Sequence, residues 1–246
     1  MEAAAAIVVI GNEILSAKVQ DSNSPWLIAE LRSVGMPVAR VHTIPDDVAI
    51  IAATVREAAA QFEQVITCGG VGPTLDDVTL EGIALALGVA LVVDPKLEAA
   101  IRAHYGAATL PSHLKMALVP QGSQLTDPPG AIWPVLDVRN VLVLPGDPSI
   151  LRRKFSSVKQ RFERRRVTLH KVHLVCDEGL VAPHLDVVHA EYPGVQLGSY
   201  PSYDGRVVRV MVTFEALDAA LTAACVRRFL ELADPATVVG TDFSEL

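Results

Sequence analysis

"TCGGVGPTLDDVT", residues 67–79, places three glycines, a proline and two adjacent aspartates in one short segment. Such a composition forms neither a good helix nor a good strand. It follows the apolar stretch QVITC, residues 64–68, and precedes a helical pattern from about Val78 to Leu87 that Gly88 can end. We therefore expect a turn between a buried strand and a helix. The turn is a plain connector, a nucleotide-phosphate cradle or a metal site.

Strand and helix patterns alternate on both sides of this turn. The predicted helices begin at Ser24, Asp46, Val78, Asp94 and Asp147, the last running to about Arg165, and residues 106–130 look irregular. Alternation of this kind predicts an α/β fold with a mainly parallel, three-layer sheet and helices on both faces. The predicted strands cover residues 4–10, 36–44, 64–68, 90–94, 131–138 and 140–146, the last two joined by a tight turn at Arg139 and Asn140.

The pattern changes after residue 166. A strand at 167–175, a helix at 179–192, a hairpin of 195–200 with 206–214, and an amphipathic helix at 217–233 follow in order. This βαββα order predicts a small α+β domain. We therefore divide the chain into residues 1–166 and 167–246.

Charge and composition limit the classes of function. The chain has 246 residues and a formal net charge of −7, which argues against broad capture of nucleic acid. The basic run at 152–166 is interpreted as a solvated helix face, although Arg152 or Arg153 could reach a ligand phosphate. Single, scattered cysteines and the lack of a long apolar run predict a soluble, cytoplasmic protein without membrane contact.

Three polar turns should meet at the carboxyl ends of the parallel strands, where ligands of such sheets bind. They are GNEIL (11–15), the opening stretch, and PGDPS (145–149). In the opening stretch, backbone amides at Gly69, Gly70 and Gly72 could converge on an anion, and a helix begins beside them. The hydroxyls of Thr74 and Thr79 add further donors.

Asp76 and Asp77 conflict with phosphate binding, because carboxylates repel phosphate. A divalent cation resolves the conflict by bridging the two kinds of oxygen, as Mg²⁺ commonly does. Glu13 could supply another oxygen ligand or act as a base. The alternative is that Asp76 or Asp77 simply caps the following helix.

These motifs, GNEIL followed by Asn23, then GGVGPTLDDVT and LPGDP, resemble the molybdopterin-binding domain of MogA/MoaB and MoeA proteins. In more detail the chain resembles the N-terminal region of the competence/damage-inducible CinA family and the N-terminal domain of eukaryotic FAD synthase. The resemblance covers residues 4 to about 165. The trailing segment resembles the small KH-type domain of CinA proteins, and LGSYPSYDGRVVRVMVTF (197–214) is also similar to FAD synthase.

The resemblance implies a ligand and a set of roles. The ligand would be a small nucleotide or pterin, with Asp76 and Asp77 holding a divalent metal (Mg²⁺, Mn²⁺ or Co²⁺) for catalysis and Glu13 nearby. A homodimer or trimer is also implied. The residues implied to hold phosphate or ligand are Gly11, Asn23, Gly69, Gly70, Gly72, Thr74, Thr79 and Gly146.

The implied activity is metal-dependent cleavage of a nucleotide pyrophosphate such as ADP-ribose or FAD. The third turn departs from the CinA pattern, because Ser149 replaces the usual glutamate; Asp147 either substitutes for it or caps a helix. Two alternatives stay open: a binding module for a pterin or nucleotide that has lost turnover, and a molybdopterin adenylyltransferase of molybdenum cofactor biosynthesis.

Overall fold

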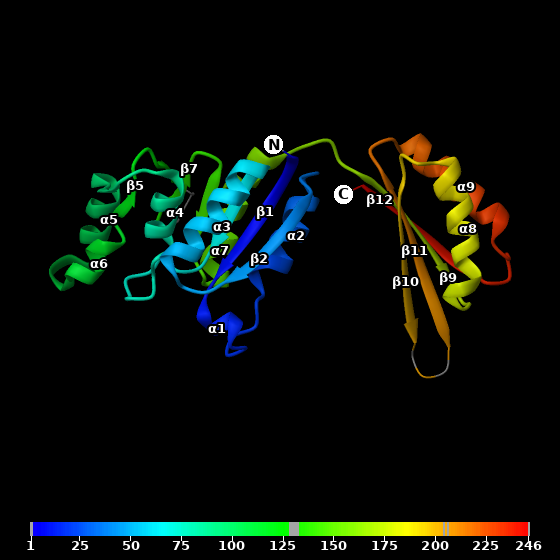
Figure 1. Cartoon of the computed structure of the whole chain (residues 1–246), viewed down its shortest axis with the longest axis horizontal. Coiled ribbons are helices and arrows are strands. Elements are labelled where there is room, and N and C mark those ends of the chain that lie inside the picture. Colours follow the sequence, from blue (N-terminus) through cyan, green and yellow to red (C-terminus); the bar gives the residue numbers. More distant parts are fainter. Residues whose placement is uncertain (1, 128–132, 204, 206, 246) are drawn as a thin grey trace. The chain divides into compact units, whose positions relative to one another are not determined.

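The structure is a computed structural model that describes residues 2–127, 133–203, 205 and 207–245. The chain divides into two compact units: residues 1–32 with 36–163, and residues 33–35 with 164–246. The division at residue 164 lies close to the boundary predicted at residue 166. Figure 1 shows the helices and strands of both units.

The first unit is built on a six-stranded, mainly parallel sheet, which confirms the predicted α/β class. Four strands are parallel, and two antiparallel strands extend one edge. In spatial order the strands are β2 (Val38–Ile44), β1 (Glu2–Ile10), β3 (Phe62–Cys68), β8 (Val141–Leu144), β7 (Val135–Val138) and β6 (Gln124–Thr126).

Helices cover both faces of this sheet (Figure 1). On one face, alternate residues of β1 share a buried apolar cluster with Ile51 of α3 (Val48–Gln61) and Ile83 of α4 (Thr79–Leu87). On the other face, α2 (Asn23–Arg32) meets α7 (Pro148–Val158) where the ring of Trp26 lies edge-on to Phe155, with ring centroids 5.8 Å apart. Because β1 is buried on both sides, it reads as a continuous apolar run.

A peripheral layer between α4 and β7 differs from the prediction. Residues 91–93 do form a strand, β4 (Leu91–Val93), but it pairs with β5 (Leu118–Pro120) in a separate two-stranded sheet. The region predicted as irregular, 106–130, is partly ordered: it holds a 3₁₀ turn, α6 (Pro111–Lys115), β5 and β6. Its last three residues and Ala131 and Ile132 lie outside the described residues. The helix α5 (Pro95–Tyr105) begins after Asp94 as predicted.

Helix starts show where local sequence reasoning misplaced a cap. Helix α2 begins at Asn23, and Asp21 rather than Ser24 accepts the first backbone N–H bonds. Helix α3 is capped by Asp47, whose Oδ1 accepts from the N–H of Ile50 at 2.9 Å, and not by Asp46. Helix α7 is capped by Asp147 as predicted, but it ends at Val158 and continues only as a 3₁₀ turn to Phe162.

The second unit is an α+β unit with one strand more than predicted. Strands β9 (Thr168–Leu174), β10 (Gln196–Tyr203), β11 (Val208–Ala216) and β12 (Val238–Glu245) form an antiparallel sheet in the order β10-β11-β9-β12. Helices α8 (Glu178–Glu191) and α9 (Ala219–Leu232) pack on it around Phe214 and Phe229. The chain order is therefore βαββαβ, that of ferredoxin-like units, instead of βαββα.

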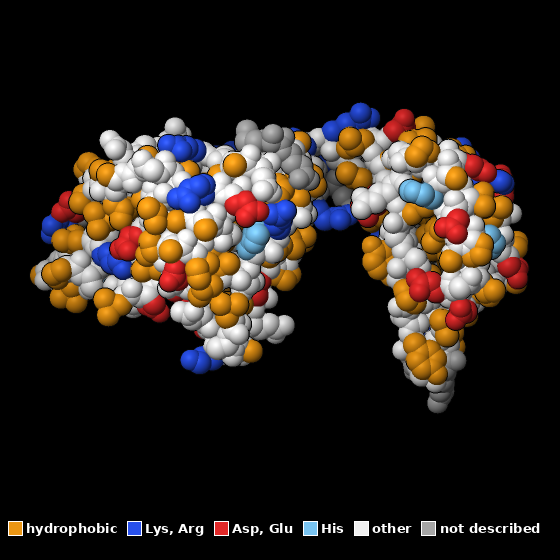
Figure 2. Space-filling model, viewed as in Figure 1, with side chains coloured by type: hydrophobic (Ala, Val, Ile, Leu, Met, Phe, Trp, Pro, Cys, Tyr) orange, Lys and Arg blue, Asp and Glu red, His pale blue; other side chains and the backbone are white. Residues whose placement is uncertain are grey.

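One face of the molecule carries charges of both signs (Figure 2). In the view of Figure 2, the Lys and Arg side chains of the described residues are scattered among acidic and apolar ones. Among the helices of the described residues, none is long and apolar enough to cross a bilayer.

The close approach of two strand ends generates a stability prediction. Gly69 has φ of 105°, and a Cβ there would lie 2.0 Å from the carbonyl oxygen of Ile10. Gly69→Ala should therefore lower the free energy of unfolding by about 2–5 kcal/mol, from left-handed strain plus overpacking. Tryptophan fluorescence during urea unfolding measures this, because Trp26 and Trp133 both lie in the first unit.

Gly122→Ala is the matched control. Gly122 has φ of 89°, but nothing lies within 4 Å of the position of its added Cβ. Gly122→Ala should therefore lower the free energy of unfolding by about 1–2 kcal/mol, from backbone strain alone. Equal losses for the two variants would contradict the proposed contact between Gly69 and Ile10.

Candidate functional site

Four turns meet at the carboxyl edge of the parallel strands. They follow β1, β2, β3 and β8, and hydrogen bonds tie them together. The N–H of Asn12 donates to Asp46 Oδ2 at 2.8 Å, and the N–H of Gly69 donates to the carbonyl of Leu144 at 3.2 Å. The side chain of Asn23 donates to the carbonyl of Gly146 at 2.8 Å. The three turns singled out in the sequence therefore lie together, and the turn after β2 joins them.

The glycine turn after β3 is braced from within. Thr79, fully buried, donates its hydroxyl to the carbonyl of Gly69 at 2.9 Å, and its N–H donates to the carbonyl of Gly70 at 3.0 Å. The hydroxyl of Thr79 is thus engaged by the turn itself, in place of the predicted contact with phosphate. Gly11 likewise has a backbone role, because its N–H donates to the carbonyl of Ile44 at 3.1 Å.

Thr74 organises the two aspartates. Its hydroxyl lies 2.6 Å from Asp76 Oδ1 and 2.6 Å from Asp77 Oδ2, and its N–H donates to Asp77 Oδ2 at 2.8 Å. The hydrogen bond from Thr74 lowers the pKa of Asp76. Neither aspartate caps α4, whose N-cap is Val78 without a side-chain bond. The alternative that Asp76 or Asp77 is merely a helix cap is therefore wrong.

Gly72 allows the Asp77 carboxylate to lie against the turn. A Cβ at Gly72 would be 2.6 Å from Asp77 Oδ2, so a larger residue would push that carboxylate away. The aspartate is thus held by the backbone and side chain of Thr74 on one side and lies over bare backbone on the other. Its position is fixed before any ligand arrives.

Lys115 anchors the same turn from the peripheral layer. Its ammonium donates to the carbonyl oxygens of Thr74 and Asp77, each at 2.9 Å. The positive charge also contributes to lowering the pKa of Asp76. Lys115 therefore acts on the turn through its backbone, and sequence reasoning missed it because its segment looked irregular.

Asp46 is a further acidic residue of the site that the sequence analysis assigned to a helix cap. Partial burial raises its pKa; the hydrogen bond from Asn12 opposes this, and the charges of Glu13, Asp76 and Asp77 raise the pKa further. Four carboxylates therefore share one region of negative potential. The signal was present in the sequence, because Asp46 lies in the turn after a parallel strand, as Glu13 and Asp77 lie in the turns after β1 and β3.

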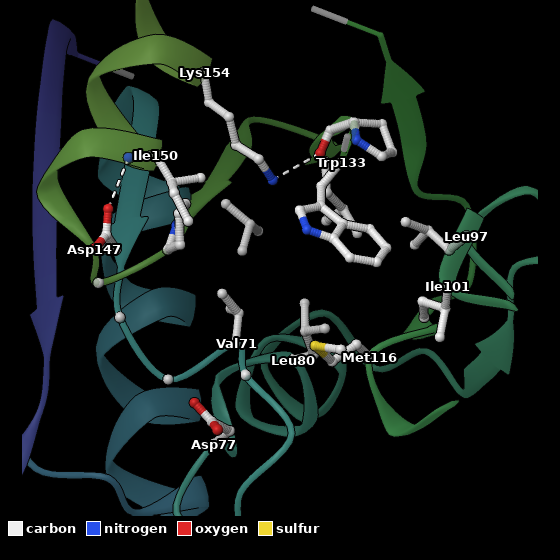
Figure 3. Close-up of a pocket in the computed structure, with 18 of the residues that line it drawn as sticks. Val71, Asp77, Leu80, Leu97, Ile101, Met116, Trp133, Asp147, Ile150 and Lys154 are labelled. Carbon is white, nitrogen blue, oxygen red and sulfur yellow. Dashed lines mark hydrogen bonds between the residues drawn. The ribbon is translucent and has the colours of Figure 1, made fainter. Parts of the chain in front are cut away.

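A cavity of about 430 Å³ opens beside these turns. Glu13, Asp77 and Asp147 supply its acidic lining, and Gly69, Gly70, Gly72 and Gly146 supply bare backbone. Thr74 and Asp76 lie outside the lining, as do Gly11, Asn23 and Thr79. The remaining wall is mostly apolar and includes Leu80, Leu97, Ile101, Met116, Trp133 and Ile150 (Figure 3). Volume and lining are those of a small-molecule site.

The third turn shows what Ser149 does in this chain. The hydroxyl of Ser149 donates to Asp147 Oδ1 at 2.6 Å, and the N–H of Ile150 donates to the same oxygen at 2.9 Å. These bonds lower the pKa of Asp147. Asp147 thus caps α7, as the cap interpretation predicted, and is also part of the cavity wall.

The acidic residues suit a cation that also binds a ligand phosphate. Among the described residues, no three His, Cys, Asp or Glu side chains are grouped closely enough to enclose a metal ion. Mg²⁺ does not need such a cage, because it usually takes one or two carboxylates, water and substrate phosphates. Asp77 and Glu13 at the cavity wall, with Asp76 beside Asp77, fit that requirement.

Comparison with known proteins assigns the chain to a protein family. A family model described as probable molybdopterin binding domain matches residues 6–164. The chain belongs to this family. A second model, described as FAD synthase, middle domain, matches residues 166–242. These matches confirm the resemblance to molybdopterin-binding domains and to FAD synthase that the sequence motifs indicated.

Individual relatives agree with this assignment. A protein of Archaeoglobus fulgidus is 33% identical over 92% of this chain and 96% of its own length. A probable FAD synthase of Caenorhabditis elegans is 28% identical over 93% of this chain but 49% of its own length. A CinA-like protein of Parasynechococcus marenigrum is 34% identical over 67% of this chain and 41% of its own. The chain thus spans less than half the length of the probable FAD synthase and of the CinA-like protein.

A solved structure supports the fold of the first unit. The crystal structure of the protein CinA from Thermoplasma acidophilum matches with a TM-score of 0.61 and 32% identity. The match covers 65% of this chain and 98% of that one. The fold of the first unit therefore agrees with an experimentally determined relative.

The raised pKa of Asp46 predicts a pH-dependent effect of its charge. An acid whose pKa is raised on folding destabilises the protein in its ionised form, so the cost is present near neutral pH and disappears as the pH falls through the raised value. Asp46→Asn should therefore increase the free energy of unfolding at about pH 7 and bring little change at about pH 4. An equal gain at both pH values would contradict the electrostatic account.

The two hydrogen bonds from Lys115 to the glycine turn predict that the turn becomes more mobile when this lysine is replaced. Lys115→Met should speed amide hydrogen exchange of residues 70–78 by about tenfold or more, because two charge-assisted bonds to the turn are lost. Lys96→Met is the control, since that lysine pairs with Asp127 at an exposed site. Unchanged exchange in the turn of Lys115→Met would show that the turn does not depend on this anchor.

Proposed function

We propose that the chain hydrolyses the pyrophosphate bond of a nucleotide such as FAD or ADP-ribose with a divalent metal ion. One observation carries the proposal: the Asp77 carboxylate is fixed at the wall of a ligand-sized cavity, beside glycine backbone that can receive a phosphate. An acidic group in that place is costly beside phosphate unless a cation lies between them. The family membership and the FAD synthase relatives are consistent with such a ligand.

Each residue has a task in this proposal. Backbone amides of Gly70 and Gly72 orient the phosphates, and Asp77, with Asp76 beside it, holds the cation. When bound, Mg²⁺, Mn²⁺ or Co²⁺ supplies charge neutralisation at the phosphoryl oxygens. Glu13 accepts a proton from the attacking water. Water adds across one P–O bond of the pyrophosphate, so that FAD yields FMN and AMP.

A non-catalytic binding module is the second candidate. It is favoured by Ser149, which turns toward Asp147 instead of supplying the carboxylate that the CinA pattern places there. Molybdopterin adenylyl transfer is the third candidate, and it is less favoured because the second unit matches the FAD synthase middle domain.

Product analysis separates these candidates. The protein is incubated with FAD, ADP-ribose or NADH and with Mg²⁺, Mn²⁺ or Co²⁺, and AMP is measured by chromatography. We expect AMP from at least one pair, and no AMP once EDTA is added. Saturable binding without AMP in every combination would refute the hydrolase and leave the binding module.

Variants test the assigned roles. Asp77→Asn and Glu13→Gln should each reduce turnover by about 100-fold or more, because one loses a metal ligand and the other a base. Asp94→Asn is the control, since Asp94 caps α5 outside the cavity lining and asparagine also caps well. Full activity of Asp77→Asn would remove Asp77 from the mechanism.

A further inference from the structure

Among the described residues, the cavity lining holds one cation, and neither the motifs nor the proposed reaction accounts for it. Lys154 of α7 extends into the cavity across from Asp77 (Figure 3). Its ammonium donates to the carbonyl of Pro134 at 2.8 Å. An ammonium has three protons, and this bond uses one of them. The neighbouring Arg152 and Arg153, which the sequence suggested as ligands of phosphate, are exposed and do not line the cavity.

Within the described part of the chain, the ammonium of Lys154 has a hydrogen-bond partner but no ion-pair partner. Among the described residues, no carboxylate lies within ion-pair distance of its ammonium. Burial, followed by the charge of Arg153, lowers its pKa to about 8. Removing an ammonium from water without a partner is costly. Side chains that bear this cost in a cavity are commonly those that meet a ligand.

Apolar side chains lie near Lys154. Trp133 and Ile150 lie beside it in the cavity (Figure 3), and Leu136 and Val143 line the same cavity. The indole of Trp133 is itself held by the ring of His104, edge-on at 5.5 Å between centroids, and by Tyr105 at 6.5 Å. A fixed aromatic face next to aliphatic side chains suits a flat ring, which can stack there with little loss of conformational entropy.

We propose that this part of the cavity, which we name the Lys154 chamber (Trp133, Leu136, Val143, Ile150 and Lys154), binds a flat heteroaromatic ring through its carbonyl oxygens. The inference rests on the proposed function, because the diphosphate of the same ligand is taken to lie at the glycine turn. The remaining protons of the ammonium donate to ring carbonyls. A flavin or pterin carries such carbonyls, whereas adenine carries none, so the chamber selects the carbonyl-bearing half of a dinucleotide.

A second phosphate is the competing occupant of the chamber. Its negatively charged terminal oxygens need several polar partners, and the chamber offers one ammonium among apolar side chains. The glycine backbone on the other side of the cavity is better suited to phosphate. The observations therefore favour a ring carbonyl over a phosphate at Lys154.

Calorimetric titrations test the proposal with three probes: FMN, AMP and inorganic pyrophosphate, each with Mg²⁺. We expect FMN to bind at least about tenfold more tightly than AMP. Lys154→Met should lower the affinity for FMN about ten- to hundredfold, because a charge-assisted hydrogen bond to the ring is lost. The affinities for AMP and pyrophosphate should stay unchanged. Lys154→Arg, which keeps a donor, should recover part of the FMN affinity.

Lys159→Met is the matched control. That lysine follows α7 and pairs with Glu30 outside the cavity lining, so its loss should leave all three affinities unchanged. Tryptophan fluorescence confirms that each variant is folded. Equal affinities of the native chain for FMN and AMP would overturn the proposal. So would an equal loss of affinity for FMN and for pyrophosphate in Lys154→Met. Titration needs no turnover, so this result is independent of whether the protein hydrolyses pyrophosphate.

Discussion

Repulsion among carboxylates at one edge of the parallel sheet is the constraint on which the site depends. Glu13, Asp46, Asp76 and Asp77 follow three different strands, and the pKa of Asp46 is raised in part by the charges of the other three. Partial burial is the larger cause of the raised pKa of Asp46. Hydrogen bonds hold the other two aspartates in place, with Thr74 bonded to both Asp76 and Asp77 and Lys115 bonded to the turn that carries them. These contacts support the proposal that a cation binds at this edge.

The same edge must also allow close approach of backbone. Gly69 passes so near the carbonyl of Ile10 that no side chain fits, and Gly72 leaves room for the Asp77 carboxylate. The glycines of the turn therefore have two effects. They bring β3 and β1 together at their ends, and they leave bare backbone at the cavity wall. Packing of the fold and preparation of the site use the same residues.

Much of the fold follows from local pattern, but several parts of the site do not. The run at 4–10 and the capped starts at Asp94 and Asp147 identify their elements, because burial and capping act over a few residues. Asp46 and Asp47 are adjacent and chemically alike, and only the path of the chain decides which one caps α3. Lys154 lies in a basic run that reads as solvated. Its place in the cavity depends on how α7 packs beside Pro134, which the sequence alone does not specify.

The central claim, that carboxylates and phosphate share a cation, is tested most directly by thermodynamic coupling. The affinity for Mn²⁺ is measured by calorimetry with and without methylene diphosphonate, a pyrophosphate analogue that is not hydrolysed. Ligands that share an ion strengthen each other reciprocally, by about 5- to 150-fold in typical cases. We predict such a gain for the native chain and its loss in Asp77→Asn. Equal Mn²⁺ affinity with and without the diphosphonate in the native chain would contradict the claim.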